Sequence, residues 1–272
     1  MEEFDHRRGI YPLALSVALA NWRILLFAAV IMSVNRFIAV GAERELGEES
    51  PYLFAVWALE MLLDFSAIVM LDFTVVPCLL SLGALRGWKA LSRASISSIG
   101  LYVGAAMLFG LILLVPVTLI GIFALGFVSP EEDATAYGVV ISIAVIAMLV
   151  LLTARLGLIF PDIVASGQMS FGRASGWGRE HFRRLNYLLW TGMAPITLIV
   201  FYLDGSFSVA DISESAPAVA GPSSGDFVHA ALVGVVGVAA SVLTTTALCK
   251  VYYVVAPPDE QLQNERIAEV FD

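Results

Sequence analysis

Six long apolar stretches, separated by short polar segments, constrain this chain more than any other feature of its sequence. Each reaches or exceeds the ~20 apolar residues that an α-helix needs to cross a bilayer. The stretches are Trp22–Val40, Tyr52–Pro77, Ser97–Phe127, Tyr137–Phe160, Leu185–Leu203 and Phe227–Ala256. They predict an all-α, polytopic membrane protein with six transmembrane helices, in which residues 1–272 form a single transmembrane domain.

The composition agrees with this class. Hydrophobic residues make up 59% of the chain and charged residues only 14%, whereas a soluble domain of this length needs more charge to cover its surface. The first apolar stretch continues too long for a cleaved signal peptide, so we expect it to remain as the first span. The net charge of -9 argues against a nucleic-acid partner.

The basic residues lie almost entirely on one side of the predicted spans. The loops on that side contain Arg7, Arg8, Arg23, Arg86, Lys89, Arg93, Arg173, Arg179, Arg183, Arg184 and Lys250. The opposite loops, Gly41–Pro51, Ser129–Ala136 and Asp204–Asp226, contain only one basic residue, Arg44. By the positive-inside rule, we predict three hairpins with both termini in the cytoplasm and cytoplasmic amphipathic segments between the hairpins.

A weak internal repeat supports the division into hairpins. Pro77, Gly83, Lys89 and Ala90 recur as Pro161, Gly167, Arg173 and Ala174, at an offset of 84 residues. Each copy follows a span that is predicted to run from outside to inside. Four matched positions are also compatible with chance agreement in apolar sequence, so both interpretations stay open.

The second copy of the repeat carries a family resemblance. It comprises Ala154–Gly167, then Ala174-Ser175-Gly176-Trp177 and Phe182-Arg183-Arg184-Leu185. This stretch resembles the membrane domain attached to some bacterial glycerophosphodiester phosphodiesterases, and similar stand-alone proteins of the bacterial inner membrane. The resemblance implies the architecture and the bacterial inner (plasma) membrane. It implies no activity, because the catalytic barrel of those enzymes has no counterpart in this chain.

Several polar residues lie at membrane depth. Glu60 and Asp64 are four positions apart and therefore share one face of the second span. The helix rise places Arg36 about 7 Å and Glu60 about 12 Å inside the outer boundary, a gap that an arginine side chain covers. We expect these two to pair, whereas Asp64 has no obvious basic partner. Such groups either hold helices together or line a polar cavity for a proton or cation.

Arg155, in the fourth span, falls close to the inner boundary of the membrane, as does Asp72 in the second span. A guanidinium near the hydrocarbon boundary needs a compensating negative charge. We therefore expect Arg155 to pair with either Asp72 or Asp162.

The cytoplasmic segment Gln168–Leu185 has an apolar stripe at helical spacing beside four arginines. The candidate lipid-interface residues are Arg173, Trp177, Arg179, Arg183 and Arg184. This combination suits a helix that lies in the headgroup layer. The alternative is that the stripe packs under the bundle and that the arginines only enforce the topology.

Small residues predict where helices approach closely. Gly100 and Gly104 form a GxxxG pair, and Gly237 begins a ridge of small residues that continues through Ser241 and Thr245. Both patterns favour close packing, either within the monomer or at a dimer face.

The sequence contains no motif for catalysis, phosphate-loop binding or metal ligation, and it predicts no cofactor. The function that we predict is a non-catalytic accessory or scaffold protein that contacts membrane lipids, a larger membrane complex or a second copy of itself. The alternative is a small-solute or proton-coupled transporter that uses Glu60 and Asp64. A lipid-processing enzyme with an unrecognised site is a more remote third.

Overall fold

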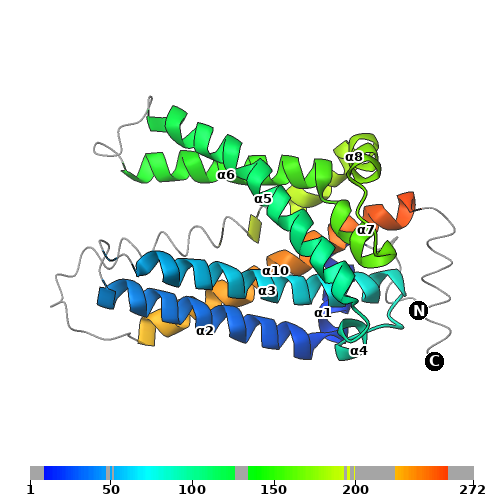
Figure 1. Cartoon of the computed structure of the whole chain (residues 1–272), viewed down its shortest axis with the longest axis horizontal. Coiled ribbons are helices and arrows are strands. Elements are labelled where there is room, and N and C mark those ends of the chain that lie inside the picture. Colours follow the sequence, from blue (N-terminus) through cyan, green and yellow to red (C-terminus); the bar gives the residue numbers. More distant parts are fainter. Residues whose placement is uncertain are drawn as a thin grey trace.

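A computed structural model describes residues 9–46, 50, 52–125, 134–192, 195–196, 199 and 224–256, and the regular secondary structure of these residues is entirely helical (Figure 1). The helices are α1 (Ile10–Ala20), α2 (Trp22–Leu46), α3 (Leu53–Leu80), α4 (Trp88–Leu91), α5 (Ile96–Leu125), α6 (Ala134–Leu156), α7 (Ile159–Ser166), α8 (Phe171–Glu180) and α10 (Ser224–Val255). Residues 182–192 are helical as well.

Four of these helices, α2, α3, α5 and α10, are long and apolar enough to cross a membrane. Helices α6 and α7 form a fifth candidate span that is bent by 42°. The all-helical architecture with several candidate membrane spans is therefore confirmed. The fifth predicted stretch, Leu185–Leu203, lies partly outside the described residues, and the count of six spans stays a prediction.

Large apolar side chains cover the outside of the long helices. On α5 alone, Met107, Leu111, Val115, Leu119 and Ile122 are between 61% and 67% exposed. An apolar surface of this extent is unfavourable in water and is the normal surface of a helix that faces lipid. The exposed faces therefore support the membrane assignment independently of helix length.

The helices α2, α3 and α10 contact one another along the bundle, and α5 pairs with α6 (Figure 1). Gly234 makes the α2–α10 contact close, since a Cβ atom on it would lie 2.3 Å from Ser33 Oγ and 2.9 Å from the Ala29 carbonyl oxygen. Gly237, in the predicted ridge, faces Met32 of α2. In contrast, a Cβ atom on Gly100 or Gly104 would meet nothing within 4 Å, so this pair does not mediate packing within the monomer.

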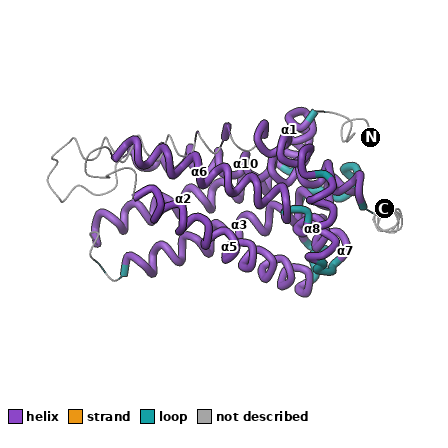
Figure 2. Tube along the Cα trace, turned by 90° about the horizontal axis from the view of Figure 1, so that it is seen from above, coloured by secondary structure: helices purple, strands orange, loops and turns teal. Residues whose placement is uncertain are grey.

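The short helices α1, α4, α7 and α8 gather at one end of the bundle (Figure 1), and the second view shows α1, α7 and α8 together at that end (Figure 2). The arrangement of the chain as three hairpins with cytoplasmic segments between them stays a prediction. A side-chain contact joins two of these segments, because Asn21 Oδ1 accepts a hydrogen bond of 2.6 Å from the backbone N–H of Gly87.

The two copies of the repeat have the same local structure. Each has a positive φ angle at the matched glycine, 88° at Gly83 and 67° at Gly167, a conformation that glycine adopts without steric cost. Each then continues into a short helix whose matched alanine is buried, Ala90 in α4 and Ala174 in α8. The shared geometry favours a true repeat over chance agreement.

Candidate functional site

The first polar cluster joins α2 to α3 at membrane depth. Arg36 Nη1 lies 3.2 Å from Glu60 Oε1, which confirms the predicted pair. Asn35 Nδ2 donates hydrogen bonds of 2.9 Å to both the Glu60 carbonyl oxygen and Asp64 Oδ1. The partner of Asp64 is therefore the side-chain amide of Asn35. The sequence pattern indicated only basic residues as partners and did not predict it. Every one of these contacts crosses from α2 to α3, so the cluster holds these two helices together.

A second cluster joins three helices around Asp72 of α3, which is 7% exposed. Its carboxylate accepts hydrogen bonds from the Tyr102 hydroxyl of α5 and the Thr245 hydroxyl of α10. The partners of Asp72 here are thus hydroxyls rather than the predicted guanidinium. Hydroxyl donors satisfy a buried carboxylate without burying a second charge.

The predicted pairing of Arg155 with Asp72 or Asp162 is wrong for the described part of the chain, where Arg155 makes no ion pair with either carboxylate. Both carboxylates have other donors: Arg173 and Tyr252 for Asp162, and two hydroxyls for Asp72. Arg155 is the penultimate residue of α6, whereas Asp162 lies in α7, beyond a bend of 42°. Gly157 lies at this break, and a Cβ atom there would be 2.5 Å from the Thr153 carbonyl oxygen.

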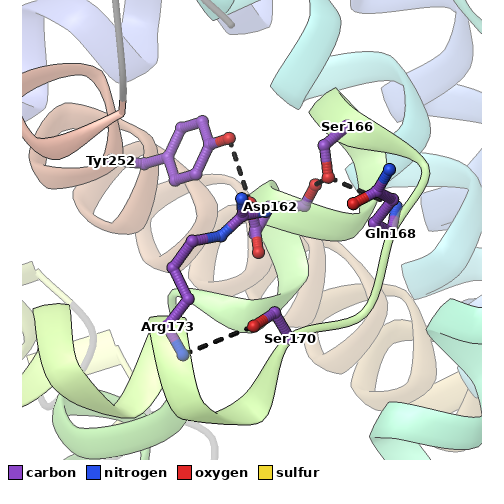
Figure 3. Close-up of polar contacts among 6 residues, drawn as sticks. All are labelled: Asp162, Ser166, Gln168, Ser170, Arg173 and Tyr252. Carbon is purple, nitrogen blue, oxygen red and sulfur yellow. Dashed lines mark hydrogen bonds and ion pairs between the residues drawn. The ribbon is translucent and has the colours of Figure 1, made fainter.

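The third cluster is centred on Asp162, whose side chain is fully buried (Figure 3). Arg173 Nη2 of α8 lies 2.7 Å from Asp162 Oδ1, and the Tyr252 hydroxyl of α10 donates to the same oxygen at 3.3 Å. Ser166 Oγ donates to the Asp162 carbonyl oxygen at 2.8 Å. The carboxylate therefore links α7, α8 and α10 at the end of the bundle.

Aromatic contacts extend this third cluster. The rings of Trp177 and Tyr252 meet edge to face with centroids 5.7 Å apart. The Arg173 guanidinium lies 5.3 Å from the centre of the Trp177 ring, within the range of a cation–π interaction. Arg173 and Trp177, two of the predicted lipid-interface residues, thus also pack against the bundle.

The other three predicted interface residues, Arg179, Arg183 and Arg184, are exposed. The predicted set therefore divides into an inward pair on α8 and an outward group of arginines that continues beyond α8. The repeat was the one sequence pattern that separated Arg173 from the others, since only Arg173 has a matched basic residue in the first copy.

Among the described residues, no group of three or more His, Cys, Asp or Glu side chains lies together as a metal site requires. Cys78 and Cys249 are buried thiols. Comparison of the chain with protein-family models, with curated proteins and with solved structures gives no significant match.

Gly178 provides a test of how α8 docks. A Cβ atom on Gly178 would lie 2.1 Å from the Arg155 carbonyl oxygen, whereas one on Gly176 of the same helix would meet nothing. We expect Gly178→Ala to destabilise the protein by about 1–3 kcal/mol through overpacking. Gly176→Ala is the matched control and should be neutral or stabilising by up to ~1 kcal/mol, because alanine favours a helix. Thermal unfolding in detergent measures both, and equal effects of the two variants would contradict the docking contact.

Proposed function

We propose that the protein is a non-catalytic accessory or scaffold protein of the bacterial inner membrane, which contacts lipid or a membrane partner. One observation carries the proposal: three carboxylates of α3, those of Glu60, Asp64 and Asp72, each accept a hydrogen bond from a neighbouring helix. Groups arranged in this way tie helices together. They stabilise a fixed bundle, and they offer no reactive group aimed into a shared cleft.

The proposed topology has six spans with both termini in the cytoplasm. The gathering of the short helices at one end supports it, because these helices carry or adjoin most of the basic residues, including Lys89, Arg93 and Arg173. Positive charge of this kind is retained on the cytoplasmic side. The resemblance to membrane domains of bacterial phosphodiesterases fits the same location.

The topology predicts the accessibility of single cysteines placed in a variant that lacks Cys78 and Cys249. With an impermeant maleimide added outside, we expect labelling at Ser50→Cys, between α2 and α3. We expect none at Ser92→Cys, which is exposed on the end that bears the short helices. Cysteines at Ser129 and Ser213, which lie outside the described residues, should be labelled like Ser50→Cys, and Ser175→Cys should not. Labelling of Ser175→Cys from outside would overturn the topology.

Purification of the native protein in a mild detergent tests the function itself. An accessory or scaffold protein should retain a stoichiometric protein partner, or assemble with itself, at its natural expression level. A partner-free monomer would count against the proposal.

The alternative function, a small-solute or proton-coupled transporter, is favoured by a different observation. Glu60 and Asp64 share one face of α3, and both residues are only half-buried. A proton or cation carrier needs carboxylates that remain accessible at membrane depth. Measurement of proton flux in proteoliposomes separates this alternative from the accessory role.

A further inference from the structure

A cavity of about 240 Å³ lies at the end of the bundle where the short helices gather. Its walls come from the last turns of α3, the segment around α4, the first turn of α5, and α7 with the glycine that follows it. Ser166 of the Asp162 cluster reaches its wall, but the carboxylates of Asp162, Asp72 and Glu60 do not line it. The cavity is smaller than the ~300–1,000 Å³ of a site for a drug-sized ligand, so it has room for one small polar group and part of a chain.

The walls of the cavity combine two chemistries. Phe73, Val76 and Leu80 of α3 and Val164 of α7 provide an apolar side. Arg93 and a group of serine hydroxyls provide a polar side. No acidic residue occurs among the described residues that line the cavity. The guanidinium of Arg93 makes the polar side positive, so the site suits an amphiphile that has a net negative charge at one end.

The polar side is built by the start of α5. Ser95 Oγ accepts a hydrogen bond of 3.0 Å from the Ser98 backbone N–H, and the two hydroxyl oxygens lie 2.7 Å apart. Gly167, with its φ of 67°, leaves this wall free of a further side chain, since a Cβ atom there would approach Ser98 Oγ to 3.4 Å. The positive end of the α5 dipole adds to the charge of Arg93 on this side.

We infer that this cavity binds the phosphate of an anionic phospholipid, with Arg93 and Ser98 at the phosphate and the start of an acyl chain on Phe73, Val76 and Leu80. A guanidinium and hydroxyls are the groups that recognise phosphate oxygens. A free phosphate ion would use the polar side alone and leave the apolar wall in contact with water. The inference rests on the membrane location in the proposed function, and it does not depend on the presence of a protein partner.

The test uses the full chain, reconstituted in vesicles of phosphatidylglycerol and phosphatidylethanolamine in equal amounts with identical acyl chains. Native mass spectrometry after extraction counts each lipid that stays bound. We expect the wild-type protein to retain more phosphatidylglycerol than phosphatidylethanolamine. Arg93→Gln should lower the ratio of the two bound lipids about tenfold, the effect of losing one charge-assisted hydrogen-bonding group. Arg93→Lys, which keeps the charge, should stay within about threefold of the wild type.

Arg86→Gln is the matched control, because Arg86 is exposed on the same connecting segment and does not line the cavity. It should leave the ratio unchanged. An equal loss in Arg86→Gln and Arg93→Gln would show diffuse attraction to the membrane surface and would overturn the site. Displacement of the lipid by millimolar inorganic phosphate would overturn the lipid assignment. If the lipid site is overturned, the prediction that a protein partner co-purifies is unaffected. The lipid site and the accessory function can therefore be rejected separately.

Discussion

Replacement of Asp162 with alanine is expected to destabilise the protein by about 1–3 kcal/mol, because it removes the buried acceptor shared by the Arg173 guanidinium and the Tyr252 hydroxyl. Asp162 is fully buried, and its carboxylate holds Arg173 of α8 at 2.7 Å and Tyr252 of α10 at 3.3 Å. Losing it should release α8 from the end of the bundle. Thermal unfolding in detergent and the amount of protein in the membrane measure the effect.

Two further variants define the Asp162 contact. Arg179→Ala removes an exposed arginine from the same helix and should change the unfolding temperature little, since surface charges contribute ~0–1 kcal/mol. Combining Asp162→Ala with Arg173→Leu should cost less than the sum of the two single changes, because the contact between the two side chains can be lost only once. Strictly additive losses in the double variant would show that the two residues do not act as a pair.

Replacement of Asp72 with alanine is the second change with a large expected effect. It leaves the hydroxyls of Tyr102 and Thr245 without their acceptor, at about 1–3 kcal/mol for each buried group left unsatisfied. Because these hydroxyls come from α5 and α10, the variant should weaken the attachment of both helices to α3. The change in unfolding free energy is measured in detergent, with circular dichroism as the signal.

The control for Asp72 is Ser66→Ala, which removes an exposed hydroxyl from the same helix and should be nearly neutral. Asp72→Asn keeps one oxygen acceptor and should lose less stability than Asp72→Ala. Tyr102→Phe should destabilise the wild-type protein more than it destabilises Asp72→Ala, since in the latter its hydroxyl has already lost its partner. The same loss from Tyr102→Phe in both backgrounds would contradict the contact.

Properties that depend on one helix at a time could be predicted from the sequence. The apolar stretches of the sequence are long enough to predict where α2, α3, α5 and α10 lie along the chain. The pairing of Arg36 with Glu60 follows from depth alone, because the helix rise fixes how far each residue lies inside the membrane.

Properties that depend on how helices meet could not be predicted in the same way. The partners of Asp162 come from α8 and α10, beyond a bend near Gly157 that periodicity does not reveal. The partners of Asp64 and Asp72 are an amide and two hydroxyls, whereas a search by charge looks only for basic residues. Gly100 and Gly104 form a packing motif by sequence, yet they face away from the rest of the monomer.

The central claim is that the carboxylates within the membrane hold the bundle together and do not carry ions. Proton flux into proteoliposomes under an imposed pH gradient tests it most directly, with the wild-type protein, Glu60→Gln and Asp64→Asn compared at equal protein content. We expect no proton-linked flux above that of empty liposomes for the wild type or for either variant. Lower accumulation of both variants in the membrane would accompany that result. A flux in the wild type that disappears in Asp64→Asn would contradict the claim and establish the transporter.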